Sequence, residues 1–196
     1  MIKRRKDFEM KKNIDREFEK QLKNLKEYVA LATINAKEYQ NVNMEIIRHF
    51  TEEENIPGVY VTLSKPYKTV EKTLADNGVD TRLIIFIDAV TETVGGELKK
   101  SENCLFIGSP EKLSDISVAM DQAVRSLPSD KKFVFFDSLS ILLMYNNAET
   151  VARFIHFLSG KMRTWKVRGI IVSLKKEKDS ELIDELMQFC DVKLDF

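Results

Sequence analysis

Residues 132–138 constrain the fold of this chain more than any other segment. They read Lys-Phe-Val-Phe-Phe-Asp-Ser, so an apolar run rich in aromatic side chains ends in one acidic residue and one small hydroxyl. Such a run is typical of a strand that is buried on both faces of a sheet. In open α/β sheets, ligands bind at the carboxyl ends of the strands. The sequence therefore places Asp137 at an edge where a ligand could bind.

From residue 27 onward, short apolar runs alternate with longer segments of helical period. Pro and Gly pairs separate several of these segments, as expected of turns. The expected strands are residues 28–34, 59–64, 83–88, 104–107, 133–137, 169–174 and 191–196, the expected helices are 44–55, 66–77, 109–125, 148–165 and one capped by Asp179 or Ser180, and the expected loops include 35–43 and 89–102. This order predicts an α/β fold with a mostly parallel sheet and helices on both faces. The alternating last segment suits an edge strand.

Residues 1–26 form a separate segment that we expect to be a basic amphipathic helical arm. They hold ten basic and five acidic residues and neither Gly nor Pro. Apolar side chains recur every three or four positions, which predicts one narrow apolar face; they are Met10, Ile14, Phe18, Leu22 and Leu25. The arm is expected to dock on the domain of residues 27–196 or to pair with a second copy. Its interleaved acidic residues oppose binding to nucleic acid or to a membrane surface.

Composition narrows the class of protein. The 196 residues are 43% hydrophobic and 32% charged, with a formal net charge of +0, which is typical of a globular protein. The cysteines Cys104 and Cys190 fit neither a disulfide framework nor a zinc pattern, so we expect buried thiols. His49 and His156 have no Cys, His or carboxylate partner at ligand spacing and are expected at helix surfaces or boundaries. Without a long apolar run, the expectation is a cytoplasmic protein with no membrane span, no metal and no cofactor.

Several strings, in their order along the chain, resemble the KaiC-like branch of the RecA-superfamily ATPases, which is common in archaea. Residues 59–66 are similar to the family's second strand and turn, and residues 133–140 are similar to its Walker B strand. Residues 169–172 are similar to the strand that follows the long helix, and residues 190–192 to the start of the closing strand. The resemblance covers about residues 27–196 and implies a RecA-like sheet with a nucleotide at its carboxyl edge.

The chain departs from that family where the family performs its chemistry. A Walker A loop uses glycines to turn successive N–H groups onto the phosphates, followed by a Lys and a hydroxyl residue. The corresponding residues 35–43 contain no glycine and no Lys-Thr or Lys-Ser pair. Ser64-Lys65 stands where the family has paired glutamates that activate water. The resemblance therefore implies a degenerate Walker A loop and a pseudo-ATPase, and it assigns no catalytic residue.

Three functions stay open at this stage. The first is a regulatory or scaffold protein that does not hydrolyse ATP and acts through protein contacts. The second is a nucleotide-binding protein or slow ATPase with an atypical phosphate loop, whose vestigial nucleotide edge would consist of Lys37, Asn41, Asn43, Asp137 and Ser138. The third is a nucleic-acid-binding accessory protein that uses the basic arm. Relatives often assemble into rings, so a homo-oligomer also stays open, beside a monomer or an arm-mediated dimer.

Overall fold

The computed structural model describes residues 2–96, 98, 101–176 and 180–196, with side chains from residue 10 onward. Its centre is a seven-stranded sheet in which every pairing is parallel, in the order β4-β3-β2-β5-β6-β1-β7. The strands are β1 (Tyr28–Ile34), β2 (Gly58–Thr62), β3 (Ile84–Asp88), β4 (Cys104–Phe106), β5 (Phe133–Asp137), β6 (Arg168–Leu174) and β7 (Val192–Asp195). The predicted α/β fold is confirmed, and β7 lies at an edge of the sheet as expected.

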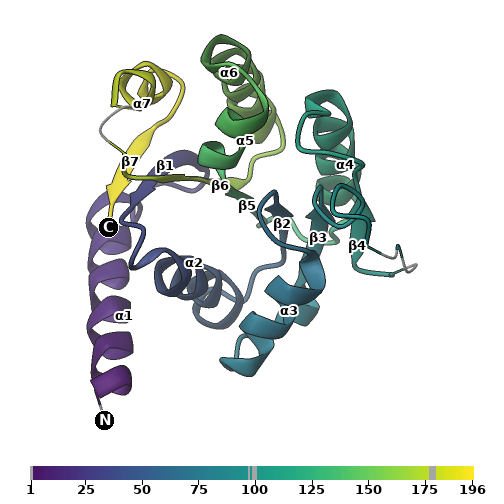
Figure 1. Cartoon of the computed structure of the whole chain (residues 1–196). Coiled ribbons are helices and arrows are strands. Elements are labelled where there is room, and N and C mark those ends of the chain that lie inside the picture. The colour runs from purple at the N-terminus through teal and green to yellow at the C-terminus, as the bar shows by residue number, and fades with distance from the viewer. Residues whose placement is uncertain (1, 97, 99–100, 177–179) are drawn as a thin grey trace.

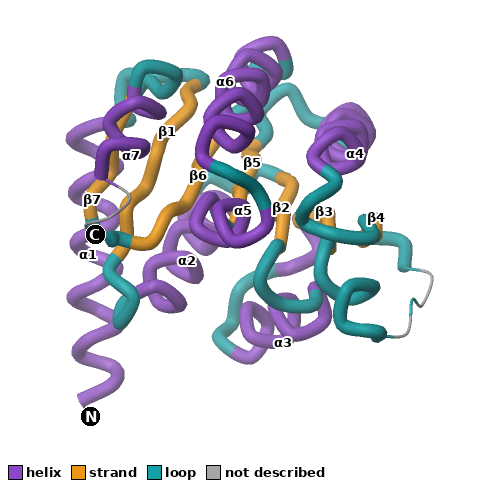
Figure 2. The backbone as a smooth tube through the Cα atoms, turned by 45° about the horizontal axis from the view of Figure 1, so that its top comes forward, coloured by secondary structure: helices purple, strands orange, loops and turns teal. Residues whose placement is uncertain are grey.

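Helices cover both faces of this sheet (Figures 1 and 2). One face carries α1 (Ile2–Gln21), α2 (Tyr39–Arg48) with its π-helical continuation η1 (His49–Glu53), and α3 (Tyr67–Asp76). The other face carries α4 (Leu113–Ser126), α5 (Leu139–Tyr145), α6 (Ala148–Thr164) and α7 (Ser180–Met187). A short 3-10 turn, η2 (Thr81–Leu83), precedes β3. Among the described residues, no helix combines the length and the apolar character that a membrane crossing requires.

Strand β5 occupies the middle of the sheet and is fully apolar on both sides until its last residue. Phe133 and Phe135 pack on the face of α1 to α3, whereas Val134 and Phe136 pack on the face of α4 to α7. All four side chains have an exposed fraction of 0%. The neighbouring β2 begins at a glycine, Gly58, because a Cβ atom there would lie 2.3 Å from the Phe133 ring. The prediction of a strand buried on both faces is therefore confirmed.

The N-terminal helix α1 docks on the body of its own chain. Ile14, Phe18 and Leu22 are 1%, 4% and 5% exposed, and they join the core beneath β1 and α2. Leu25, which we expected on the same apolar face, is 36% exposed because α1 ends at Gln21. The apolar face of the arm is thus largely used within one chain.

Two segments differ from the sequence-based expectation. The loop predicted over residues 35–43 is short, since α2 begins at Tyr39 and buries Val42 and Asn43. The polar first turn hides this start, because the apolar period becomes visible only from Val42 onward. Residues 139–145, for which we predicted no element, form α5, whose Leu139 and Leu142 are buried against β6 and α6. Of the two residues expected to cap α7, Asp179 lies outside the described residues.

The two thiols lie away from any disulfide partner. Cys104 is buried in β4, and Cys190 is partly buried after α7. Burial raises the pKa of the Cys190 thiol to about 12 and also raises that of Cys104. Both groups are therefore poor nucleophiles at neutral pH.

Candidate functional site

A cavity of about 460 Å³ lies at the carboxyl edge of the sheet, between the start of α2, the ends of β2 and β5, and α3. All five residues of the predicted vestigial edge line it, namely Lys37, Asn41, Asn43, Asp137 and Ser138. Lys37 is exposed, Asn41 is half-buried, and the other three are buried. The topology explains this gathering, because β1 and β5 run in the same direction and are separated only by β6.

The carboxylate of Asp137 is held by two tyrosine hydroxyls. Tyr60, on the adjacent strand β2, donates a hydrogen bond of 2.6 Å to Oδ2. Tyr39, at the first residue of α2, donates to Oδ1. Asp137 is 4% exposed, so these two donors replace water as its partners. Each carboxylate oxygen thus faces a hydroxyl of the protein itself.

The electrostatics of this group follow from its burial. Burial raises the pKa of Asp137 above its ordinary value, while the Tyr39 and Tyr60 hydroxyls and the Lys65 ammonium act in the opposite direction. Burial and the nearby carboxylate raise the pKa of both tyrosines, so both remain hydroxyl donors at neutral pH. Two tyrosine donors thus face one carboxylate acceptor.

Asn43 lies beside this network, one turn after Tyr39 on α2. Its side chain acts to lower the pKa of both Tyr39 and Tyr60 against the effect of burial. Its Oδ1 atom is the one buried side-chain polar atom of the described residues that has no hydrogen-bond partner. Asn43 therefore lies beside the two tyrosines and has one buried acceptor atom without a partner.

Lysine side chains lie at the mouth of the cavity, and its inner wall combines polar and apolar side chains. Ser64 and Lys65, which follow β2, are both exposed and both line the cavity. Its remaining walls include apolar side chains from α2, α3, α5 and β6, among them Met44, Val70, Leu74, Ile141 and Leu174. A ligand in this cavity would meet lysine ammonium groups at the rim and apolar groups deeper inside.

Neighbouring polar residues have structural partners. Ser140 accepts a hydrogen bond of 2.9 Å from the Leu174 backbone N–H and lies 3.2 Å from the Ser173 hydroxyl, so it fastens α5 to β6. Asp88, at the end of β3, accepts hydrogen bonds from the backbone N–H groups of Tyr67 and Thr91 at 2.8 and 2.9 Å. Asp88 therefore holds the adjacent loops in place and does not line the cavity.

The sequence did not reveal the two tyrosines. Tyr39 fell within the expected loop, and Tyr60 was one residue of an apolar strand. Their hydrogen bonds join Asp137 to positions 98 and 77 residues away, so no local spacing could have found them. One feature of β2 gave a partial indication of Tyr60. Side chains alternate between the two faces of a strand, and in a strand buried on both faces the Tyr60 hydroxyl requires a polar partner.

His49 is a partly buried helix residue and His156 an exposed one, as expected of surface or boundary positions. The expectation that His49 has no carboxylate partner was wrong. The Nδ1 atom of His49 lies 2.9 Å from Glu53 Oε2 and 3.9 Å from Asp15 Oδ1. Glu53 comes close because it follows His49 by four residues, one turn along the helix, and Asp15 comes close because α1 docks there. His156 stacks on Phe189 with ring centroids 4.5 Å apart.

Comparison with known proteins places the chain in a family. The model of the family of unknown function DUF7504 matches residues 39–196. The chain belongs to the DUF7504 family. No curated protein sequence matches it.

Two solved structures share its fold. The KaiC-like protein PH0186 from the archaeon Pyrococcus horikoshii OT3 matches with a TM-score of 0.59 and 15% identity, over 86% of this chain and 71% of its own. The uncharacterized protein PH0321 from Pyrococcus horikoshii, solved in complex with an unknown peptide, matches with a TM-score of 0.60 and 14% identity, over 91% of this chain and 82% of its own. The similarity supports a KaiC/RecA-like fold, as the sequence strings suggested.

Proposed function

We propose that this DUF7504 chain is a RecA-fold protein that does not hydrolyse ATP and that binds a protein segment at the carboxyl edge of its sheet. One observation carries the proposal: both carboxylate oxygens of Asp137 accept hydrogen bonds from Tyr39 and Tyr60. In ATPases of this kind, an acidic residue at this position must face the magnesium ion of the nucleotide. A carboxyl group that already accepts hydrogen bonds from two tyrosine hydroxyls is poorly suited to that role.

The loop before α2 supports the first half of the proposal. An anion nest requires backbone positions of positive φ that aim successive N–H groups at a phosphate. Among the described residues, φ is positive only at Asn55, Lys166, Gly78 and Gly95, and none of these lies in residues 35–38. Glu38 at the start of α2 adds a negative charge beside the position of a phosphate. We interpret residues 35–43 as a degenerate Walker A segment.

Residues 64–65 give separate support. A water-activating base must be unprotonated at neutral pH, and a lysine meets this requirement only if its pKa falls by several units. Lys65 is exposed at the rim of the cavity, and Ser64 beside it carries no carboxylate. The Ser64-Lys65 pair therefore supplies no general base for hydrolysis.

The lining of the cavity supports the second half. It combines apolar walls with Lys37 and Lys65 at the rim, which suits a peptide that carries an apolar side chain beside an acidic one. A volume of about 460 Å³ is enough for such side chains. The fold neighbour PH0321 was solved with a peptide, so a peptide ligand is compatible with this architecture.

A peptide-display selection tests this function. The protein is used to select from a random peptide library, and binding is compared with the variant Thr73→Trp, which fills the mouth from α3. Thr69→Trp, one turn earlier on α3 and outside the cavity lining, is the matched control. We expect acidic–apolar peptides whose affinity falls at least about 10-fold in Thr73→Trp and stays unchanged in Thr69→Trp. Selected peptides that bind all three proteins equally would contradict the proposal.

Nucleotide binding with slow or no hydrolysis is the second candidate. It is favoured by the N-terminus of α2, which has no side-chain cap at Glu38 and lies beside Lys37 at the cavity. Protection of residues 35–43 from hydrogen exchange by ATP would support it. The same experiment in Thr73→Trp tests whether the protection arises in the cavity.

Nucleic-acid binding by the arm has less support. The side chains of Lys3, Arg4, Arg5 and Lys6 lie outside the described residues, and Lys11 pairs with Glu53 at 2.7 Å. The burial of the α1 apolar face also leaves little of it for an arm-mediated dimer.

A further inference from the structure

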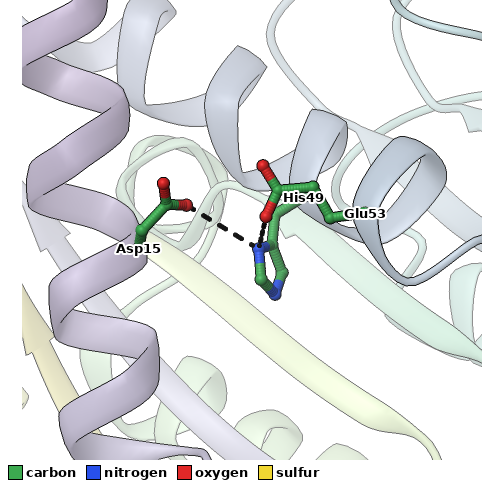
Figure 3. Close-up of side chains that lie close together, drawn as sticks. All are labelled: Asp15, His49 and Glu53. Atoms are coloured by element: carbon green, nitrogen blue, oxygen red, sulfur yellow. Dashed lines mark hydrogen bonds and ion pairs between the residues drawn. The ribbon is translucent and has the colours of Figure 1, made fainter.

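We propose that Asp15, His49 and Glu53 bind a divalent transition-metal ion, such as Zn²⁺, that fastens α1 to the body of the protein. Figure 3 shows the three side chains converging, with Asp15 pointing from α1 towards the imidazole and Glu53 approaching it from the same turn. One nitrogen and two carboxylate oxygens form a ligand set that such ions accept. This site lies at η1, away from the residues that line the carboxyl-edge cavity.

The distances fit a shared ion. The Nδ1 atom of His49 is 2.9 Å from Glu53 Oε2 and 3.9 Å from Asp15 Oδ1, and the three ligand atoms lie within 4.8 Å of one another. Ligands of a tetrahedral zinc ion are about 3.4 Å apart, given bonds of about 2.0–2.2 Å. Small rotations of the two carboxylates would therefore bring all three atoms into the coordination sphere.

The π-turn explains why one imidazole has two carboxylates from its own helix. Glu54 N–H donates to the His49 carbonyl over five residues, at 3.0 Å, which defines the wider turn. In this turn both Glu53 and Glu54 lie beneath His49. π-turns of this kind are frequent at functional sites, because they redirect side chains that an α-helix would spread apart.

Glu54 serves as the outer partner of the imidazole. The His49 Nε2 atom lies 3.3 Å from Glu54 Oε1, and Glu54 also pairs with Arg168 of β6. A histidine that binds a metal through one nitrogen commonly donates its other N–H to a carboxylate, which fixes the tautomer and the ring. With the proton on Nε2, the lone pair of Nδ1 faces Asp15 and Glu53.

The charge balance favours an added cation. Three carboxylates, those of Asp15, Glu53 and Glu54, surround the imidazole, against the two cations Lys11 and Arg168. With a neutral imidazole the cluster carries one excess negative charge. A divalent ion would reverse this excess.

The surroundings allow water to complete the coordination. A cavity of about 260 Å³ is lined by the three ligands and by Glu54, Phe18 and Arg168. The Phe18 ring packs edge-on against the imidazole with centroids 4.7 Å apart, which fixes the ring plane. Because the ligands come from α1 and from η1, ion binding would add directly to the docking of the arm.

Zinc titration of the EDTA-treated full-length protein tests the proposal. We expect one Zn²⁺ per chain by calorimetry and a higher unfolding temperature in Zn²⁺. The isosteric variants Asp15→Asn and Glu53→Gln should weaken binding by at least about 10-fold. The control is Glu52→Gln, which is next to Glu53 but faces Arg48 at 3.7 Å, and its affinity should equal that of the wild type. Equal zinc affinity in the wild type, Asp15→Asn and Glu53→Gln would overturn the proposal.

A substitution of Lys11 distinguishes a metal site from a cluster of charges that is only structural. Its ammonium group lies 2.7 Å from Glu53 Oε1 and competes with a metal ion for that carboxylate. Lys11→Met should therefore tighten zinc binding while it removes an ion pair from the apo protein. In the His156→Gln variant, His49 is the remaining histidine. Its Nδ1 nitrogen, and not its Nε2 nitrogen, should show a change in NMR chemical shift when zinc is added. Unchanged affinity in Lys11→Met, or no shift at Nδ1, would overturn the proposal.

Discussion

Replacing Tyr60 by Phe removes one of the two hydroxyls that hold Asp137. The ring keeps its volume, so the packing of Tyr60 on Phe86 and Phe135 is preserved. What is lost is a hydrogen bond of 2.6 Å to Asp137 Oδ2 in a buried setting. The variant therefore isolates the contribution of this donor to stability and to the charge state of Asp137.

The expected loss depends on whether Asp137 is ionised. A hydrogen bond to a charged group contributes about 1.5–3 kcal/mol, whereas a bond between neutral groups contributes about 0.5–1.5 kcal/mol. Burial raises the folded-state pKa of Asp137 above its ordinary 3.8, and the tyrosine donors oppose that shift. The folded protein thus binds a proton more tightly than the unfolded chain, so stability falls as pH rises from 3.8 through the folded-state pKa. Loss of Tyr60 raises this pKa further, so the fall in stability extends to higher pH and becomes larger.

Urea unfolding of wild type and Tyr60→Phe at about pH 7 and about pH 4 measures the effect. We expect the variant to lose about 1.5–3 kcal/mol at the higher pH and distinctly less at the lower pH. Tyr28→Phe is the control, because Tyr28 is also buried in a strand and its hydroxyl has no hydrogen-bond partner among the described residues. A loss below about 0.5 kcal/mol at both pH values would refute the assigned role of Tyr60.

Four further results are expected from the packing. Phe18→Ala should lower the free energy of unfolding by about 3–5 kcal/mol in urea, because this 4% exposed ring fixes α1 to the body. Gly58→Ala should destabilise by at least about 1–3 kcal/mol, since its Cβ atom would lie 2.3 Å from the facing ring of β5. Gly160→Ala, in open space on α6, should stabilise by about 0.5–1 kcal/mol. Cys104 and Cys190 should not react with iodoacetamide in the folded protein at about pH 7, and both should react in urea.

Much of the fold could be predicted because the local sequence pattern of each strand is clear. The run that ends at Asp137 is apolar on both faces, and the alternation of residues 191–196 correctly indicated an edge strand. The start of α2 at Tyr39 could not be predicted, since the first three residues of its first turn, Tyr39, Gln40 and Asn41, show no apolar helical period. Burial of that turn against Asp137 stabilises it, and this contact exists only in the folded chain.

The candidate site was predictable in its position and not in its chemistry. The strand order brings Lys37, Asn41, Asn43 and the end of β5 to one cavity, as expected from a parallel sheet. The partners of Asp137 depend on register across β2 and on the orientation of α2, which no single string encodes. For His49 this holds in part, because Glu53 follows it by four residues on the predicted helix, whereas Asp15 is brought near only by the docked arm.

Calorimetry with MgATP, together with phosphate release, tests the central claim most directly. The account predicts no measurable heat of binding at millimolar nucleotide and no turnover, because Tyr39 and Tyr60 occupy the carboxylate that a magnesium ion would need. The double variant Tyr39→Phe with Tyr60→Phe shows whether that carboxylate gains affinity for Mg²⁺ once it is released. Micromolar MgATP binding by the wild type, with turnover that Asp137→Asn abolishes, would contradict the account.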